Sequence, residues 1–276
     1  MNMKTDFSVT SGKALLCGEY RGEGPCVIML HAGVADRRMW RHALAHLGES
    51  NLAVAYDRRG FGETLSPDEP FSHIEDLDRV IDNFDCEQAT LIGCSQGGRI
   101  AIDYALAHPG KVAALVLVAT AITGASAPSD YLREIAGMLA DLDDAEMEHD
   151  HERINAIEAR LWLDGPLGAN GRIGGEVRQL FLDMNGHALR QAPFTLEQPG
   201  ESAMERLHGL TAPTLVIWGT LDFPHIQLRS QWIAETIPNA KSFTMDGCAH
   251  LPNLEQSAQF NSAVANFITQ SVILRI

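Results

Sequence analysis

Three polar side chains in this 276-residue sequence could together perform nucleophilic catalysis: Ser95, Asp222 and His250. A serine hydroxyl is a weak nucleophile until a base takes its proton, and the base acts best when a carboxylate orients it. Ser95 is the centre of the pentapeptide Gly-Cys-Ser-Gln-Gly (93–97). Serine, then aspartate, then histidine is the chain order that accompanies such a glycine-flanked serine.

The glycines beside Ser95 predict a sharp turn from a strand into a helix. An apolar run rich in β-favouring residues occupies 90–94, and a helical pattern begins at Gln96. Such a turn strains its central residue and leaves no room for larger flanking side chains. It would expose the Ser95 hydroxyl at the carboxyl edge of a sheet, with the Gln96 N–H available to an oxyanion. The alternative is a glycine-rich turn with an incidental serine.

The candidate base and acid also follow apolar runs. His250 lies in a loop after 242–246, and Asp222 follows 214–219. The carboxyl ends of parallel strands meet at one edge of a sheet, so both residues would lie near Ser95. Either residue alone has ordinary loop or turn roles, but the ordered set predicts a catalytic triad. Asp246 is an alternative acid, although only four residues separate it from His250.

A second oxyanion donor is expected in the stretch Leu-His-Ala-Gly-Val-Ala-Asp (30–36), which follows the first core strand. Small residues there let the backbone approach a substrate oxygen closely. We expect the donor to be the N–H of Gly33, with Val34 as the next candidate. His31 is predicted to brace this loop through hydrogen bonds.

The elements that would position these residues alternate along the chain between strands and helices. This alternation predicts an α/β fold with a doubly wound, mostly parallel sheet. The first 22 residues suggest an additional strand pair at one edge of the sheet. The strands are expected at 27–31, 52–57, 90–94, 114–119, 214–219 and 242–246, and the helices at 38–47, 74–84, 96–107, 228–236 and 257–268.

The alternation stops between about Gly124 and Arg206, where helical patterns occur without a convincing strand. The expected helices are 129–142, 145–163 and 176–190, and a breaker cluster rich in glycine separates the last two at 165–175. A helical insertion in an α/β core is the simplest account. We therefore expect residues 1–124 and 207–276 to form the core and residues 125–206 to form an inserted helical segment.

Composition excludes several classes of partner. Asp and Glu number 36 against 21 Lys and Arg, and the formal charge of −15 disfavours nucleic acid and anionic membranes. The five cysteines are widely spaced without a Cys-x-x-Cys pair, which indicates reduced thiols. No secretory signal or membrane-spanning run is visible, so we expect a cytoplasmic location. Cys94, beside the candidate nucleophile, is expected to be inert.

Two other patterns receive ordinary interpretations. His149 and His151 lie within the acidic stretch 148–152, but on a helix residues two apart do not share a face. We therefore expect a solvated acidic surface there and no metal site. The stretch Gly-Phe-Gly-Glu-Thr (60–64) lacks the further glycine or Gly-Lys-Ser/Thr that a nucleotide-binding loop requires.

Five motifs together resemble the α/β-hydrolase fold superfamily, in its capped branch of esterases and lactonases. They span residues 27–254 in the family's order. Ala32 stands where the family usually has glycine, and Thr64 where it usually has serine. The motifs are Leu-His-Ala-Gly-Val-Ala-Asp with the downstream Trp40, Tyr-Asp-Arg-Arg-Gly-Phe-Gly-Glu-Thr (56–64), Gly-Cys-Ser-Gln-Gly-Gly (93–98), Trp-Gly-Thr-Leu-Asp (218–222) and Gly-Cys-Ala-His-Leu-Pro-Asn (247–253).

This resemblance implies that the inserted helices cap a pocket over Ser95. It implies a serine hydrolase that cleaves a small ester or lactone through an acyl-enzyme, without metal or organic cofactor. Dehalogenases and epoxide hydrolases use an aspartate nucleophile, which Ser95 argues against. Carbon–carbon bond hydrolysis, a lyase or perhydrolase reaction, and a non-enzymatic ligand-binding role remain alternatives. The candidate pocket residues are Trp162, Phe181, Met184 and Phe223.

Overall fold

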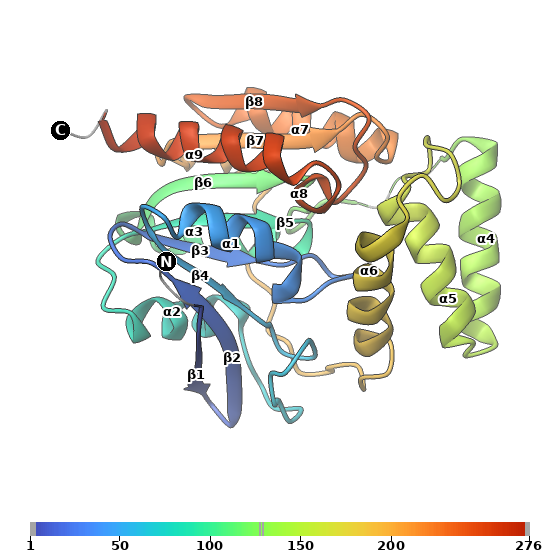
Figure 1. Ribbon diagram of the computed structural model, residues 1–276, viewed down its shortest axis with the longest axis horizontal. Coiled ribbons are helices and arrows are strands. Elements are labelled where there is room, and N and C mark those ends of the chain that lie inside the picture. Colours follow the sequence, from blue (N-terminus) through green and yellow to red (C-terminus); the bar gives the residue numbers. More distant parts are fainter. Residues whose placement is uncertain (1–3, 127, 129, 274–276) are drawn as a thin grey trace.

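The computed structural model describes residues 4–126, 128 and 130–273, and it is built around an eight-stranded sheet (Figure 1). The strands lie in the order β1-β2-β4-β3-β5-β6-β7-β8, and β2 runs antiparallel to both of its neighbours. The predicted α/β fold with a mostly parallel sheet is confirmed. The strands are β1 (Thr5–Ser11), β2 (Ala14–Arg21), β3 (Cys26–Leu30), β4 (Leu52–Tyr56), β5 (Ala89–Cys94), β6 (Val112–Val118), β7 (Thr214–Gly219) and β8 (Ala240–Met245).

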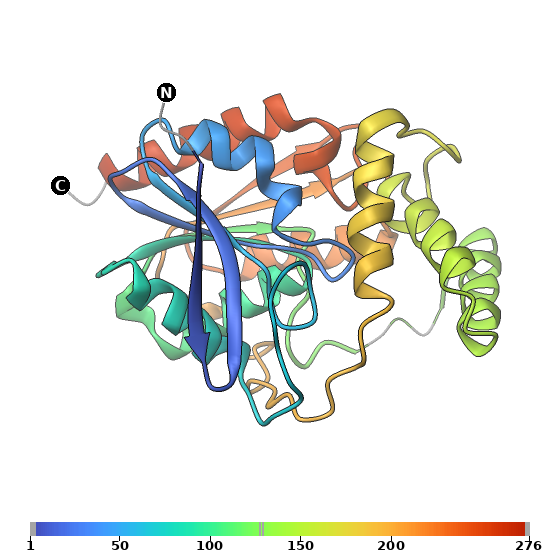
Figure 2. The ribbon, with the colours of Figure 1, turned by 60° about the horizontal axis from the view of Figure 1, so that its bottom comes forward.

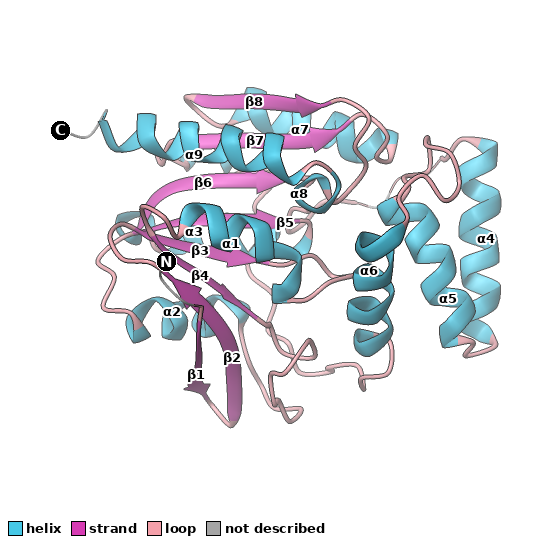
Figure 3. Ribbon diagram, viewed as in Figure 1, coloured by secondary structure: helices cyan, strands magenta, loops and turns pink. Residues whose placement is uncertain are grey.

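Helices cover both faces of this sheet (Figure 3). In β3, Val27 and Met29 belong to one apolar cluster, and Ile28 and Leu30 belong to the other. Parallel strands buried on both faces must be apolar throughout, which explains the continuous apolar runs. One face packs against α1 (Arg41–Leu47), α8 (Pro252–Glu255) and α9 (Ser257–Ile273), and the other against α2 (His73–Asn83), α3 (Gln96–Ala107) and α7 (Pro224–Thr236).

Three further helices follow β6 and lie beyond the carboxyl ends of the central strands (Figures 1 and 2). They are α4 (Arg133–Met147), α5 (His151–Glu158) and α6 (Gly175–Ala188), and a π-helical turn, η3 (Ala159–Leu163), extends α5. We refer to residues 125–206 as the cap. The helical character of this segment matches expectation, whereas its division from the core at 124/125 and 206/207 stays a prediction.

Helix boundaries inside the cap differ from those expected. The sequence predicted a break near 143–144, but α4 continues to Met147 and the chain turns at His149, whose φ is +55°. Asp150 then begins α5, because its carboxylate accepts the Arg153 N–H at 3.0 Å. The expectation that His149 lies on a helix was therefore wrong. The first cap helix also begins at Arg133 rather than at 129.

Two helices of the core also begin at other residues than expected, because local residues at the helix start decide where each begins. The stretch 38–47 divides into a 3₁₀ turn, η1 (Arg37–Trp40), followed by α1, and the side chain of Asp36 caps the turn by accepting the Arg38 N–H. Helix α7 begins four residues before the expected 228, at Pro224. Proline at the first helical position needs no N–H partner, so this start agrees with ordinary helix chemistry.

Candidate active site

Ser95 forms the turn between β5 and α3 with a strained backbone. Its φ is +53° and its ψ is −115°, a region that residues other than glycine rarely occupy. The Ser95 N–H donates to the Val118 carbonyl at 2.9 Å, and the Ser95 carbonyl accepts the N–H groups of Arg99 and Ala121. These bonds hold the strained residue, and its side chain is partly exposed. The predicted strand-to-helix turn is present.

The glycines around Ser95 are required by close backbone contacts. A Cβ atom at Gly93 would lie 2.4 Å from the Gly97 carbonyl oxygen, and one at Gly97 would lie 2.3 Å from the Leu30 carbonyl oxygen. Both separations are far below van der Waals contact. The spacing Gly-x-Ser-x-Gly therefore allows β5, α3 and the end of β3 to approach one another closely.

Asp222 and His250 form a buried pair. His250 Nδ1 lies 2.8 Å from Asp222 Oδ2, and the exposed fractions of the two residues are 2% and 0%. The other carboxylate oxygen of Asp222 accepts the Phe223 N–H at 2.8 Å. Because a carboxylate only accepts, Nδ1 carries the imidazole proton and Nε2 is left as the basic nitrogen. The pair has the geometry of a base oriented by an acid.

Asp246, the alternative acid, does not occupy this position. Its side chain is exposed, and its backbone carbonyl accepts a hydrogen bond from Gln256 Nε2 at 2.9 Å. The structure therefore places Asp222, at the end of β7, beside the imidazole of His250.

Cys94 connects the turn of Ser95 with the loop of His250. Its Sγ lies 3.6 Å from the His250 carbonyl oxygen, although 156 residues separate the two in sequence. Burial raises the pKa of the Cys94 thiol well above its ordinary value, and the charges of Asp222 and Glu255 raise it further. The thiol stays protonated at neutral pH, as expected of an inert cysteine. The contact brings Ser95, the next residue, to the same edge of the sheet as His250.

The loop after β3 is braced by His31. Its Nε2 accepts the Arg58 N–H at 3.0 Å, so Nδ1 carries the proton and donates to the Ala32 carbonyl at 2.8 Å. Burial lowers the pKa of His31 well below its usual value, and the positive charge of Arg58 lowers it further. A neutral imidazole provides this one donor and one acceptor. His31 thus has the bracing role that the sequence predicted.

The Ala32 carbonyl also accepts a hydrogen bond from Arg58 Nη2 at 3.3 Å. The Ala32 carbonyl and the Gly33 N–H belong to one trans peptide and point in opposite directions. The hydrogen bonds that fix the orientation of the Ala32 carbonyl therefore also fix the direction of the Gly33 N–H. A Cβ atom at Gly33 would lie 2.7 Å from the side-chain nitrogen of Gln96, so the two predicted oxyanion donors belong to neighbouring residues. Val34, the other candidate, follows in the same turn and is half-buried.

Arg58 was not identified from the sequence as a site residue. Its exposed fraction is 1%, its Nη1 donates to Gln96 Oε1 at 3.2 Å, and its guanidinium lies 4.6 Å from the Phe61 ring centroid. Burial lowers its pKa to about 10, which leaves it charged at neutral pH. Within the described part of the chain, no carboxylate forms an ion pair with it. The doubled arginine of the 56–64 motif was the available signal.

Two of the four predicted pocket residues lie against the acid–base pair. The Trp162 ring centroid is 4.7 Å from that of His250 and 4.9 Å from that of Phe223. Phe181 and Met184 lie on α6, fully buried in the apolar cluster that also contacts Trp162, and no ring contact joins them to His250 or Phe223 among the described residues. Their role as pocket residues stays a prediction.

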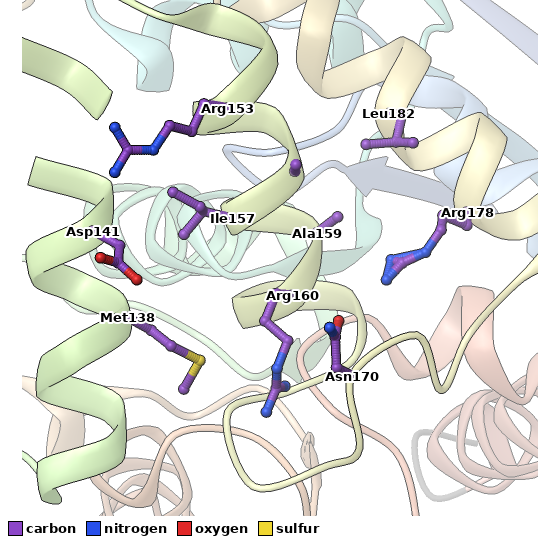
Figure 4. Close-up of a pocket in the computed structure, with 10 residues that line it drawn as sticks. Met138, Asp141, Arg153, Ile157, Ala159, Arg160, Asn170, Arg178 and Leu182 are labelled. Atoms are coloured by element: carbon purple, nitrogen blue, oxygen red, sulfur yellow. The ribbon is translucent and has the colours of Figure 1, made fainter. Parts of the chain in front are cut away.

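A cavity of about 540 Å³ lies within the cap, away from the acid–base pair (Figure 4). Residues from α4, α5, α6, the turn η3 and the loop that follows it line the cavity, including Arg160 of η3 and Arg178 of α6. Arg160 donates to the carbonyls of Gly165 and Gly168, and Arg178 pairs with Asp164. These arginines therefore stabilise the loop beside the cavity.

Comparisons with known proteins place the chain in a family. A model of the "Alpha/beta hydrolase family" matches residues 27–263. The chain is 30% identical over 264 residues to a 2-hydroxymuconate semialdehyde hydrolase of Pseudomonas sp. (strain CF600), covering 91% of this chain and 89% of that one.

Solved structures show the same fold. A thermophilic esterase from Thermogutta terrifontis has a TM-score of 0.75 at 22% identity and covers 98% of this chain and 99% of its own. An esterase from Rhodococcus sp. ECU1013 has a TM-score of 0.76 at 23% identity, with 97% and 98% covered. With the family match over most of its length, this chain belongs to the α/β-hydrolase family.

Proposed function

We propose that this hydrolase cleaves a small carboxylic ester or lactone through an acyl-enzyme, with Ser95 as nucleophile. The observation that carries the proposal is the buried hydrogen bond between His250 Nδ1 and Asp222, which leaves Nε2 as the basic nitrogen. Cys94 joins this pair to the strained turn that presents Ser95. Such a set of residues is suited to acyl transfer.

In the first half-reaction, His250 Nε2 takes the proton of the Ser95 hydroxyl as its oxygen attacks the substrate carbonyl carbon. Asp222 stabilises the imidazolium that forms. The N–H groups of Gly33 and Gln96 bind the oxyanion of the tetrahedral intermediate. When the intermediate collapses, the C–O bond to the alcohol breaks and His250 returns the proton to the leaving oxygen.

In the second half-reaction, His250 takes a proton from water as the water oxygen attacks the acyl carbon of the ester formed with Ser95. The bond to Ser95 breaks, the serine oxygen regains a proton from His250, and the acid leaves. No metal or organic cofactor takes part in the proposed cycle.

The surroundings of the acid–base pair support a neutral, apolar acyl group. Trp162 presents its aromatic ring beside His250, and the Phe223 ring packs against that of Trp162. The nearby cation Arg58 is buried and directs its hydrogen bonds to Ala32 and Gln96. Apolar walls with a few placed polar groups are typical of small-molecule sites.

Carbon–carbon bond hydrolysis is the second candidate, favoured by the nearly full-length similarity to the 2-hydroxymuconate semialdehyde hydrolase. The same residues could serve it, because attack on a ketone carbonyl forms a comparable oxyanion. The reactions differ in the leaving group, which is carbon rather than oxygen. Substrate preference therefore distinguishes the two candidates.

The first experiment is labelling with a fluorophosphonate probe, followed by intact mass and peptide mapping, for wild type and Ser95→Ala. We expect one adduct, on Ser95, that the variant lacks. A panel of p-nitrophenyl esters, lactones and 2-hydroxymuconate semialdehyde then ranks substrates by kcat/KM. Absence of the adduct from folded wild type would refute an activated Ser95. A tenfold preference for the semialdehyde would establish the second candidate, and labelling without turnover would favour a ligand-binding role.

A further inference from the structure

We propose that the cap loop, residues 164–174, positions the Asp222–His250 pair, and that Arg172 is the positioning residue through which it acts on His250. The inference rests on the proposed function, because it assigns the loop a role in placing the base. It follows from contacts that the loop makes with both the turn of Asp222 and the turn of His250.

The cap loop is held rigidly by charged side chains. The carboxylate of Asp164 is buried and accepts the N–H groups of Gly171 at 2.8 Å and Ile173 at 3.1 Å. Arg178 pairs with the same carboxylate from α6. Arg160, in the turn η3 that follows α5, donates to the Gly168 carbonyl at 2.9 Å, and Figure 4 shows its side chain beside the loop that carries Asn170. A loop braced in this way can transmit the position of the cap.

The beginning of the loop touches both catalytic turns. Gly165 has a φ of +82°, and a Cβ atom there would lie 2.3 Å from the Leu221 carbonyl oxygen and 2.6 Å from the Ala249 Cβ. Leu221 precedes Asp222, and Ala249 precedes His250. The Leu221 N–H also donates to the Cys248 carbonyl at 2.8 Å. Gly165 therefore packs where the acid turn and the base turn meet.

Arg172 connects the loop to the turn of His250. Within the cap, its Nε donates to the Asp164 carbonyl at 3.0 Å and its Nη2 to the Leu163 carbonyl at 2.9 Å. Across to the core, its Nη1 donates to the Gly247 carbonyl at 2.7 Å, and its Nη2 pairs with the Glu255 carboxylate. One guanidinium thus joins the cap to Gly247, which precedes His250 in its turn, and to Glu255 at the end of α8, which follows it.

Glu255 extends this connection to both neighbours of His250. Its side chain is fully buried and accepts the Ala249 N–H at 2.9 Å and the Leu251 N–H at 3.2 Å. The backbone on either side of the base is therefore held by a carboxylate, and Arg172 is the cation paired with that carboxylate.

The charge of Arg172 also maintains the ionised form of Glu255. Burial raises the pKa of Glu255, whereas the hydrogen bond and charge of Arg172 oppose that rise. Among the described residues, the thiols of Cys248 and Cys94 also interact with this carboxylate, which raises their pKa values. Removing Arg172 would leave a buried carboxylate without its cation, which is unfavourable. The turn of His250 would then shift or Glu255 would take up a proton.

Rates of acyl transfer are sensitive to such shifts, since a displacement of about 1 Å can lower turnover about 100-fold. We expect Arg172→Ala to lower kcat and the fluorophosphonate labelling rate about 10- to 100-fold, with KM within about twofold. Arg172→Lys should restore part of the loss, because an ammonium can pair with Glu255. The control is Arg153→Ala, which removes the exposed ion pair with Glu148. It should behave as wild type.

A second matched pair tests the contact of Gly165. Gly165→Ala and Gly175→Ala both place a side chain at positive φ, +82° and +59°, but an added Cβ meets no neighbouring atom within 4 Å at Gly175. Backbone strain is therefore common to the two variants, and the clash with Leu221 and Ala249 is confined to the first. We expect only Gly165→Ala to lower kcat. Equal activity of the two variants would contradict the proposal.

The imidazole ¹⁵N spectrum of His250 provides a readout that does not require turnover. We expect Arg172→Ala to change the His250 signals and Arg153→Ala to leave them unchanged. If wild type fails to label at Ser95, the proposed function is refuted, while this spectrum still reports on positioning. Unchanged signals and unchanged kcat in a folded Arg172→Ala would overturn the positioning role. If that variant does not fold, Arg172→Lys and the glycine pair decide the question.

Discussion

The indole of Trp162 lies against the imidazole of His250, with ring centroids 4.7 Å apart and planes inclined by 51°. Trp162 belongs to the π-helical turn η3, which inserts a wider turn at the end of α5. A π turn rotates the side chains that follow it relative to an α-helix, and such turns are frequent at functional sites. The cap thereby contributes an aromatic wall directly beside the proposed base.

We predict that Trp162→Ala changes which acyl chains the enzyme accepts. An indole buries about 150–250 Å² of surface, so its loss leaves space beside His250 that a short acyl group does not fill. The kcat/KM for acetyl esters should fall about tenfold, and the optimum should move to longer chains. A series of p-nitrophenyl esters measures this shift. Trp162→Phe should retain most of the original preference, and an unchanged optimum in Trp162→Ala would contradict the wall assignment.

The assignment of Asp222 as the acid can be tested against Asp246, the other candidate carboxylate. Asp222→Asn should lower kcat about 10⁴-fold, because an amide at this position no longer selects the tautomer that leaves Nε2 basic. Asp246→Asn should stay within about twofold of wild type, since Asp246 is exposed. Steady-state kinetics on the best ester tests both. If the two effects were exchanged, Asp246 would become the acid.

Arg58 provides a test of the oxyanion loop. Arg58→Met removes the hydrogen bonds to the Ala32 carbonyl and to Gln96, and it also removes a buried positive charge beside them. We expect kcat to fall about tenfold or more while KM changes little, because the affected groups are the proposed oxyanion donors. The kcat of Arg58→Lys should lie between those of wild type and Arg58→Met, because lysine retains the charge but lacks the planar set of donors. A folded Arg58→Met with wild-type kcat would exclude this role.

The sheet and the proximity of Asp222 to His250 were predictable because they depend on local patterns. The apolar runs placed each core strand within about two residues, and the glycines at 93 and 97 identified the turn of Ser95. Asp222 and His250 followed from their places after β7 and β8. The sequence favoured Asp222 over Asp246, because only four residues separate Asp246 from His250, and the structure places the Asp222 carboxylate beside the imidazole.

Other parts of the site could not be predicted because they depend on contacts between distant segments. Arg172 and Glu255 are 83 residues apart, and nothing in the glycine-rich stretch 165–175 indicates that its arginine reaches the turn of His250. Arg58 appeared as an ordinary charged residue of a turn, although the structure buries it. The break at His149 was missed because the helical pattern continues across it, and only the cap formed by Asp150 decides where α5 begins.

The burial of His31 and His73 leads us to expect that the protein becomes less stable in mild acid. The pKa values of His31 and His73 lie well below the usual value. Burial is the largest cause in both cases, and the positive charge of Arg58 is the second. As pH falls below about 6.5, the unfolded chain binds protons that the folded chain does not. The free energy of unfolding should therefore decrease toward acid pH, by up to about 1.4 kcal/mol per pH unit for each histidine.

His73→Gln isolates one of these contributions. Urea unfolding of wild type and variant at pH 7.5, 6.5 and 5.5 should give a shallower pH dependence for the variant, by about 1 kcal/mol per pH unit below pH 6.5. The absolute stability of the variant is expected to be lower, because the His73 ring packs against Phe71 at 5.2 Å between centroids. His208→Gln makes the same chemical change at an exposed position and serves as the control. Identical slopes for wild type and His73→Gln would show that the buried imidazole takes up its proton without unfolding.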